Sequence, residues 1–277
     1  MTRSPNDSIP VALSIAGSDP SGGAGIQADL KTFHQFGVYG EAVVTLLTVQ
    51  NTLRVDRVEC LPASLVVEQI RAVLEDVPPA AAKTGALGNR EIIEAVAEAA
   101  SGFAFPLVVD PVMISKHGAP LIAEEARAAL RSALLPRAAL ITPNLAEAAD
   151  LTGIAVADLD DMRRAAERIC QLGARAALVK GGHLQDRATD VLCWEGGWRE
   201  FTSPRIDTRH THGTGCTYSA AIAAELAKGT PLEEAVSRAK RFITEAIRTN
   251  PGLGHGSGPV NHHALGETGD SPHVPRT

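Results

Sequence analysis

The chain has 277 residues, of which 44% are hydrophobic and 21% charged, so it holds enough apolar material for a sizeable core. Its formal net charge of −6 argues against a general basic surface of the kind that binds nucleic acid. No apolar run reaches the roughly 18 residues that span a bilayer. The N-terminus also lacks the apolar stretch of a signal peptide, so we expect a cytoplasmic protein with no membrane contact.

Short apolar runs alternate with amphipathic stretches along the chain. We predict strands at 11–17, 42–49, 80–87, 106–112, 138–144 and 176–182. Amphipathic stretches, typical of helices, lie at 25–36, 64–77, 89–100, 124–135 and 161–173. Uninterrupted Val, Leu, Ile and Ala in the strands indicate a sheet buried on both faces. The alternation therefore predicts repeated βαβ units around a mostly parallel sheet.

The last third of the chain follows a different pattern. Two β-like runs near 189–203 predict an antiparallel hairpin at the edge of the sheet, and two long helices follow at about 214–228 and 232–249. The glycine-rich stretch after them predicts irregular structure. With no internal repeat and no long Pro/Ser linker, we expect one domain over 1–263 and a disordered tail over 264–277.

The loop Gly17–Leu30 follows the first predicted strand and is rich in glycine. Its glycines do not have the G-x-G-x-x-G spacing of a dinucleotide site, and the whole chain lacks a Walker lysine motif. Two interpretations stay open: a tight strand-to-helix turn, or a loop whose backbone approaches a small ligand. Asp29 likewise could accept a hydrogen bond from a ligand hydroxyl or interact with the helix dipole.

Two acidic residues follow later strand ends. Asp110 ends a very apolar strand, where an acid is costly unless it is solvated, paired or near a metal. Asn144 and Glu147 have the spacing of a helix capping box. Alternatively, Asp110 and Glu147 lie near a hydrated Mg²⁺, which takes one or two carboxylates alongside phosphate oxygens.

Two further segments suit phosphate binding. Lys180 leaves a buried strand before a glycine pair, where its charge could meet a transferring phosphate. In THGTGCTYSAA (211–221), Gly213 and Gly215 flank Thr214 where a helix begins, so unpaired backbone N–H groups could form an anion hole. Cys216 falls in the first helical turn, where a thiol pKa tends to fall, although a small packed residue is the alternative.

The cysteines and His212 do not suggest a metal site. Cys60, Cys170, Cys193 and Cys216 are widely scattered and form no C-x-x-C pair, which indicates neither structural zinc nor a disulfide framework. No pattern of further ligands accompanies His212.

Taken together, these loops resemble the ribokinase-like superfamily, and most closely its bacterial hydroxymethylpyrimidine/phosphomethylpyrimidine kinases. The resemblance runs from about residue 10 to 263, and the order and density of the matching motifs make chance improbable. The motifs are SIAGSDPSGGAGIQADLKTF (14–33), YGEAVVTLLTVQNT (39–52), AAKTGALG (81–88), VVDPVMISKHGAPLI (108–122), LITPNLAEAADLTG (140–153), LVKGGHL (178–184), RIDTRHTHGTGCTYSAAIAAELAKG (205–229) and GLGHGSGPVNH (252–262).

The resemblance implies a three-layer α/β/α fold and an ATP-dependent phosphotransferase of thiamine biosynthesis. Its substrate would be 4-amino-5-hydroxymethyl-2-methylpyrimidine, phosphorylated first to the monophosphate and then to the pyrophosphate. A homodimer is implied by analogy. A pyridoxal or pyridoxine kinase on the same scaffold is the alternative, and a ligand-binding regulator without catalysis is a third.

The resemblance also assigns roles to individual residues. Cys216 takes the place of the aspartate base of the sugar kinases, and Gln50 that of the residue that recognises the pyrimidine. Many members carry methionine where Ala86 stands, so the pocket over the ring is expected to be larger here. The remaining expected contacts are Asp29 and Gly17 with the substrate, Asn144, Glu147 and Lys180 with ATP, Asp110 and Glu147 with Mg²⁺, and Gly213, Thr214 and Gly215 with the transferring phosphate.

Overall fold

The computed structural model describes residues 9–113, 124–182 and 187–264, and these form one sheet with helices on both faces. The strand order across the sheet is β3-β2-β1-β4-β5-β6-β7-β8-β9. The strands are β1 (Val11–Ser18), β2 (Tyr39–Gln50), β3 (Val55–Cys60), β4 (Ala81–Thr84), β5 (Leu107–Val109), β6 (Leu140–Ile141), β7 (Ala176–Gly181), β8 (Arg187–Trp194) and β9 (Gly197–Pro204).

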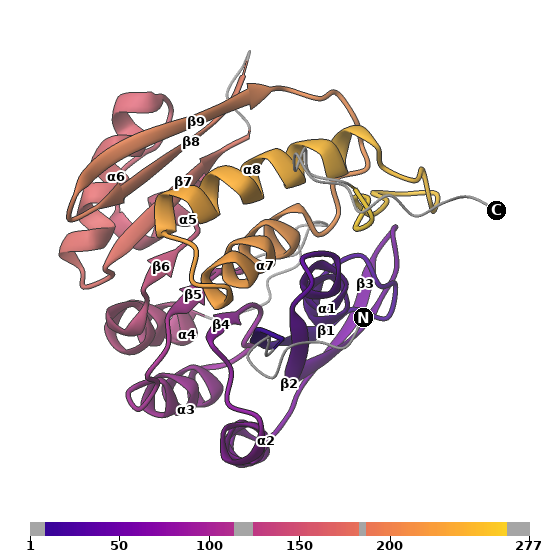
Figure 1. Ribbon diagram of the computed structural model, residues 1–277, viewed down its shortest axis with the longest axis vertical. Coiled ribbons are helices and arrows are strands. Elements are labelled where there is room, and N and C mark those ends of the chain that lie inside the picture. The colour runs from indigo at the N-terminus through magenta and orange to yellow at the C-terminus, as the bar shows by residue number, and fades with distance from the viewer. Residues whose placement is uncertain (1–8, 114–123, 183–186, 265–277) are drawn as a thin grey trace, which may run out of the picture.

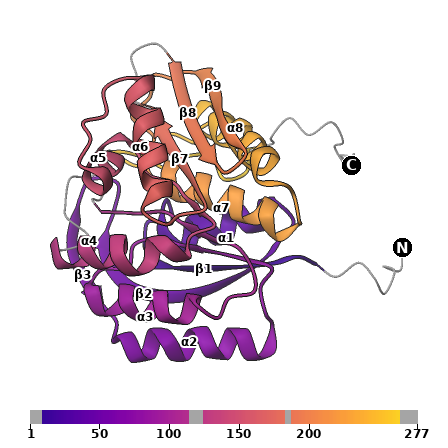
Figure 2. The same ribbon diagram turned by 90° about the vertical axis from the view of Figure 1, so that its left-hand side faces the viewer.

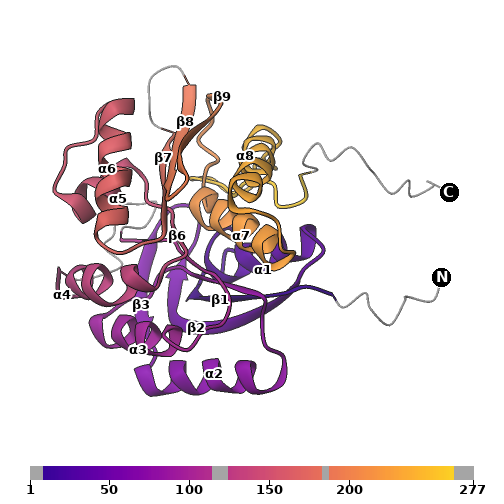
Figure 3. The ribbon, with the colours of Figure 1, turned by 60° about the vertical axis from the view of Figure 1, so that its left-hand side comes forward.

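The helices form two outer layers. Helices α1, α7 and α8 cover one face of the sheet and α2 to α6 cover the other, as Figure 3 shows edge-on and Figure 2 from the side of α2 to α6. In the described part of the chain, no helix is both long and apolar enough to cross a membrane. The helices are α1 (Gly25–Gln35), α2 (Ala63–Asp76), α3 (Arg90–Ala100), α4 (Glu124–Ala129), α5 (Leu145–Thr152), α6 (Leu159–Gln171), α7 (Thr214–Ala227) and α8 (Leu232–Arg248).

Alternating side chains of the strands feed two separate apolar cores. In β5, Leu107 and Val109 pack into the core beneath α2 to α6, whereas Val108 packs beneath α1, α7 and α8. Ala177 and Leu178 of β7 divide in the same way, because successive strand residues point to opposite faces. The prediction of a sheet buried on both faces, within a three-layer α/β/α fold, is therefore confirmed.

The sheet is mostly parallel, also as predicted. β1 pairs in parallel with both β2 and β4, and β4 to β7 continue the parallel order. The antiparallel pairs are β2 with β3, β7 with β8, and β8 with β9 (Figure 1). The chain leaves β1 to β2 on one side and returns to β4 on the other, so the loops after β1 and β4 diverge at their carboxyl ends. Such a switch point is where open α/β sheets bind ligands.

Two elements differ from the sequence-based expectation. The charged strand β3 was not predicted; its alternating exposed residues, among them Arg57 and Glu59, suit the solvated edge of a sheet rather than an apolar run. The helix expected over 124–135 is α-helical only in α4, and then continues as a π turn (Leu130–Leu134) and a 3₁₀ turn (Leu135–Arg137). Pro136 explains the end of this helix, because it donates no backbone hydrogen bond.

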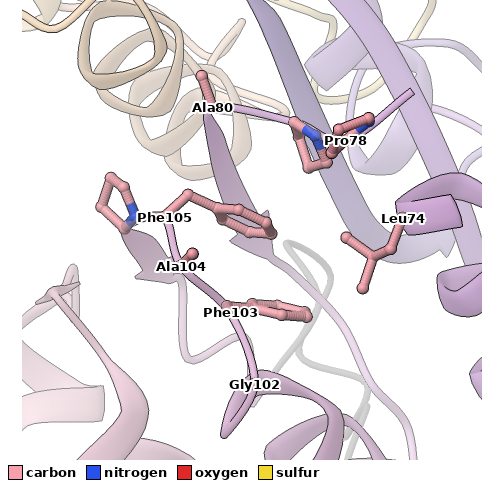
Figure 4. Close-up of a pocket in the computed structure, with 9 residues that line it drawn as sticks. Leu74, Pro78, Ala80, Gly102, Phe103, Ala104 and Phe105 are labelled. Atoms are coloured by element: carbon pink, nitrogen blue, oxygen red, sulfur yellow. The ribbon is translucent and has the colours of Figure 1, made fainter. Parts of the chain in front are cut away.

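A large surface hollow lies at the opposite end of the sheet from the switch point. It has a volume of about 550 Å³ and is lined mainly by apolar residues that precede β4 and β5 (Figure 4). The rings of Phe103 and Phe105 stack there with centroids 4.7 Å apart. No residue predicted to carry chemistry contributes to this hollow.

The expected tail over 264–277 lies outside the described residues except for Ala264.

Helix α7 begins against the loop that follows β1. Its N-cap, Gly213, has a φ of 76°, and a Cβ added there would lie 1.8 Å from the carbonyl oxygen of Gly23. Gly213 is therefore required both for the left-handed backbone and for the close approach of two chain segments. This contact fixes where the first turn of α7 lies relative to the switch point.

We predict that Gly213→Ala and Gly229→Ala differ in their effect on the free energy of unfolding. Gly229 has a similar φ of 79°, but an added Cβ would meet nothing within 4 Å. Gly229→Ala should therefore cost about 1 kcal/mol from backbone strain alone, and Gly213→Ala about 3 kcal/mol or more because backbone must also move. Urea titrations of both variants give the comparison, and equal costs would contradict the contact with Gly23.

Candidate active site

The loops predicted to carry chemistry converge at the carboxyl ends of the strands. A Cβ added to Gly215 would lie 3.3 Å from Lys180 Nζ and 3.6 Å from Asp110 Oδ2, so the first turn of α7 faces the ends of β5 and β7. Lys180 N–H also donates to the carbonyl of Pro143 at 2.8 Å, which brings Asn144 beside the end of β7. Segments from four distant parts of the sequence thus meet at one place.

The first turn of α7 offers backbone N–H groups to this place. The Thr214 N–H lies 3.3 Å from the carbonyl of Thr211, whereas those of Gly215 and Cys216 have no acceptor within the described residues. Since the helix dipole adds partial positive charge at this end, the geometry suits an anion. Phosphate binding by these groups stays a prediction.

Asp110 lies at the centre of the polar cluster and is only 3% exposed. Its Oδ1 accepts hydrogen bonds from Lys180 Nζ at 3.2 Å and from Thr142 Oγ1 at 3.3 Å. Its Oδ2 accepts one from Ser219 Oγ, on α7, at 3.3 Å. The buried acid is therefore paired and hydrogen-bonded, as an acid at the end of an apolar strand must be.

Glu147 takes part in the capping box that the sequence predicted. Its Oε2 accepts from the Asn144 N–H at 2.8 Å, and Asn144 Oδ1 accepts from the Glu147 N–H at 2.9 Å. Burial raises the pKa of the Glu147 carboxyl to about 7, opposed by Lys180 and assisted by Asp110. Capping does not exclude the second interpretation, because the same carboxylate lies within electrostatic reach of Asp110. A role toward Mg²⁺ stays a prediction.

A buried ion pair beneath the site escaped the sequence analysis. Lys83 Nζ donates to both carboxylate oxygens of Asp29, at 2.9 and 3.0 Å, and Ser14 Oγ donates to Asp29 Oδ2 at 2.6 Å. The side chains of Lys83 and Asp29 are both 0% exposed. The Asp29 carboxylate thus accepts hydrogen bonds from Lys83 and Ser14 in this structure. Direct contact of Asp29 with a substrate hydroxyl stays a prediction.

The expected fall in the pKa of Cys216 is wrong. Burial raises the pKa of its thiol to about 11, with the charges of Asp29 and Asp110 acting in the same direction. The nearby Lys83 and the N–H of Gly25 oppose this rise but do not overcome it. The position in a first helical turn was therefore a misleading signal, because burial raises the thiol pKa by more than Lys83 and the Gly25 N–H lower it.

Gln50 reaches the site from the end of β2. Its side-chain amide nitrogen lies 3.2 Å from His212 Nε2, and that same nitrogen of His212 lies 2.7 Å from Asp19 Oδ2. Asp19 and His212 were not predicted as site residues. In the part of the chain that the structure describes, no three His, Cys, Asp or Glu residues are grouped to hold a metal ion. His212 contacts Asp19 and Gln50 by hydrogen bonds.

The two remaining predicted substrate contacts are Gly17, near the carboxyl end of β1, and Ala86, in the loop after β4. The carbonyl of Ala86 accepts a hydrogen bond from Thr45 Oγ1 at 2.7 Å, and its side chain is half-buried. A Cβ added to Gly17 would lie 2.5 Å from Leu46 Cδ1, so packing against β2 already accounts for this glycine. Substrate contact by either residue stays a prediction.

The fold resembles solved kinases along nearly its whole length. The structure of an ADP complex of Bacillus subtilis pyridoxal kinase matches with a TM-score of 0.86 and 40% identity, covering 93% of this chain and 98% of that one. Phosphomethylpyrimidine kinase from Clostridium difficile matches with a TM-score of 0.77 and 46% identity, covering 86% and 99%. The fold and these loops define a phosphotransferase of the ribokinase-like class.

The sequence comparisons narrow this class to one family. The phosphomethylpyrimidine kinase pattern matches residues 19–261. Hydroxymethylpyrimidine/phosphomethylpyrimidine kinases of Bacillus subtilis and Rhizobium meliloti are 46% and 51% identical, covering 93% and 91% of this chain and 96% of each relative. The thiamine biosynthesis bifunctional protein ThiED of Geobacter sulfurreducens is 49% identical, and the match spans 51% of its length. The chain belongs to the phosphomethylpyrimidine kinase family.

We predict that breaking the buried Lys83–Asp29 pair destabilises the protein strongly. Lys83→Met leaves the Asp29 carboxylate buried without its partner, which should cost about 3–5 kcal/mol of unfolding free energy. Arg90→Ala is the matched control, since it breaks an exposed pair with Glu94 and should cost less than about 1 kcal/mol. Chemical denaturation measures both costs, and a small cost for Lys83→Met would show that the pair contributes little.

A second prediction concerns the reactivity of the Cys216 thiol. Because its pKa is raised to about 11, roughly a thousandth of the thiol is ionised at pH 8, and alkylation should be slow there. The rate of iodoacetamide labelling, followed on the Cys216 peptide by mass spectrometry, should rise with a midpoint near pH 11. Fast labelling at pH 8, comparable to a free cysteine peptide, would show that the thiol is activated.

Proposed function

We propose that this protein transfers the γ-phosphate of ATP to 4-amino-5-hydroxymethyl-2-methylpyrimidine, and then phosphorylates the monophosphate to the pyrophosphate. The observation that carries the proposal is the first turn of α7 facing Lys180 and Asp110, with the half-buried Gln50 in contact with His212 just before that turn. The names of the related kinases support the same substrate and a place in thiamine biosynthesis. A homodimer and a cytoplasmic location stay predictions.

The residues around Lys180 suit a nucleoside triphosphate. A Staphylococcus aureus pyridoxal kinase of the same fold, with a TM-score of 0.85 and 36% identity, was solved with the ATP analogue AMP-PCP and pyridoxal. In our proposal, the nucleotide phosphates bind beside Asn144, Glu147 and Lys180. The ammonium group of Lys180 neutralises negative charge on the phosphates. The N–H groups of Gly215 and Cys216 hold the transferring phosphoryl group.

The donor set also fits Mg²⁺. Asp110 and Glu147 are oxygen donors close enough that the charge of Asp110 helps to raise the pKa of Glu147. A divalent cation between them would offset this repulsion, and Mg²⁺ takes one or two carboxylates beside phosphate oxygens. Bound there, it would neutralise negative charge on the phosphates.

Positioning carries more of this reaction than base catalysis does. With a pKa of about 11, the Cys216 thiol is almost entirely protonated near neutral pH and is a poor proton acceptor. Phosphoryl transfer depends mainly on alignment and on charge neutralisation. We therefore assign the acceleration of phosphoryl transfer chiefly to Lys180 and the backbone of residues 213–216. In this proposal, Cys216 packs beside the reacting hydroxyl.

A pyridoxal kinase is the second candidate, favoured by the solved pyridoxal kinases with TM-scores of 0.85 and 0.86. The smaller Ala86 leaves room for a larger ring. The deciding experiment incubates the protein with ATP, Mg²⁺ and either alcohol, and identifies the products by mass spectrometry. The pyrimidine monophosphate and pyrophosphate are expected, and a preference for pyridoxal in kcat/KM would overturn the assignment.

We predict that Gly215→Val lowers kcat much more than it lowers stability. The new side chain would crowd the space between Lys180 and Asp110, where only flexible side-chain ends have to move. Loss of one preorganised anion contact should reduce kcat by about 100-fold or more. Gly102→Val, at an exposed glycine far from the site, is the control. Normal kcat in a folded Gly215→Val protein would contradict the assigned phosphate site.

A further inference from the structure

Three polar side chains from distant segments meet at one edge of the site. Asp19 follows β1, Gln50 ends β2 and His212 precedes α7. His212 Nε2 is shared, since it lies 2.7 Å from Asp19 Oδ2 and 3.2 Å from the amide nitrogen of Gln50. The hydrogen on this ring nitrogen therefore decides how the glutamine is oriented.

Asp19 is held as a carboxylate by the backbone of its own loop. Its Oδ1 accepts from the Ser21 N–H at 2.9 Å, and its Oδ2 accepts from the Ala24 N–H at 2.9 Å. Although burial raises its pKa, hydrogen bonds from His212 and Ser21 bring it below the usual value. An ionised carboxylate only accepts hydrogen bonds, so His212 must carry a hydrogen on Nε2 and donate it to Asp19.

A hydrogen on His212 Nε2 cannot face the NH₂ group of Gln50, because both are donors. A half-turn of the glutamine amide exchanges its oxygen and nitrogen with almost no change of shape. The orientation that satisfies all three residues has Gln50 Oε1 accepting from His212, which shares its hydrogen between two acceptors. The NH₂ group is then the end of the amide that remains for a ligand.

His212 is too tightly held to adapt instead. Its N–H donates to the carbonyl of Gly258 at 3.0 Å, and the residue is 3% exposed. A Cβ added to Gly23 would lie 2.6 Å from the ring Cδ2, so the imidazole packs directly on the glycine loop. Because these contacts hold the imidazole ring in place, the hydrogen on His212 Nε2 sets the orientation of the Gln50 amide.

We propose that Asp19 and His212 orient Gln50 so that its NH₂ group faces the bound ring, and that the site thereby selects a heteroaromatic alcohol with an acceptor nitrogen at that position. This inference rests on the proposed function for the use of the pocket by such an alcohol. In this orientation the NH₂ group donates to the ring, while the amide oxygen accepts from His212. Asp19 and His212 act here as positioning residues.

The test uses the hydroxymethylpyrimidine and the two analogues in which one ring nitrogen is replaced by C–H. With ATP and Mg²⁺, the unmodified protein should lose about 10- to 100-fold in kcat/KM on one analogue, because the NH₂ group that the bound ring covers is left unpaired. In His212→Leu, the amide is free to turn, so this discrimination should fall below about 3-fold. KM for the parent pyrimidine should rise, with kcat changed less than about 2-fold.

Two further variants distinguish a loss of Gln50 orientation from a general loss of folded structure. His212→Gln keeps a side-chain N–H able to donate to Asp19, and it should restore much of the discrimination. His34→Leu replaces an exposed histidine on α1 and should behave as the unmodified protein. If His212→Leu does not fold, as judged by circular dichroism, Asp19→Asn decides in its place, because it removes the carboxylate that fixes the hydrogen.

The outcomes are distinguishable. Failure of the unmodified protein to phosphorylate the pyrimidine overturns the proposed function, and this inference with it. Turnover with the same discrimination in the unmodified protein and in a folded His212→Leu or Asp19→Asn variant overturns the orienting role alone. Equal use of both ring analogues by the unmodified protein overturns the selection of an acceptor nitrogen.

Discussion

The site depends on an alternation of buried acidic and basic side chains across the carboxyl ends of the strands. Asp29 pairs with Lys83, and Asp110 pairs with Lys180, with Glu147 beyond. Each lysine lies between carboxylates, so no acid faces another acid without a cation nearby. Isolated charges at such burial would be too costly to keep ionised. The pairing therefore lets carboxylates and ammonium groups coexist where a polyphosphate and a cation are expected to bind.

The charge balance of this cluster has a chemical consequence. When all five groups are ionised, the carboxylates outnumber the ammonium groups by one, and the pKa of Glu147, raised to about 7, shows where the excess charge is least stable. A bound divalent cation would change this excess of one negative charge into an excess of one positive charge. The phosphates of a nucleotide would make the site negative again. Under our proposal, this charge balance would favour binding of metal and nucleotide together over binding of either alone.

The sequence predicted the site residues at strand ends and turns better than the buried contacts between distant segments. Strand ends and glycine turns have local signatures, so Asp110, Lys180 and the turn at 213–216 were predicted from their places at strand ends and at a helix start, and the structure brings them together. Lys83 was missed because a lysine within an apolar strand has no local signal for its partner, which lies on α1, 54 positions earlier in the chain. Asp19 and His212 were missed for the same reason, since their contact spans 193 positions. The pKa of Cys216 depended on burial, which a motif does not encode.

Selectivity between pyrimidine and pyridoxal cannot follow from the features that the two kinds of kinase share. In our proposal the α7 turn and the charged cluster act on phosphate, which is common to both reactions, so a TM-score of 0.86 with a pyridoxal kinase is compatible with either substrate. Discrimination must come from residues around the ring. In our proposal, Ala86 affects only the space available there, whereas Gln50 would contribute a directed hydrogen bond. A directed donor rejects a ring that lacks an acceptor more strongly than extra space admits a larger one, because an unpaired buried N–H costs more than a partly filled pocket. In our proposal, the fixed His212, rather than the size of residue 86, is therefore the stronger determinant of which ring nitrogen pattern this kinase accepts.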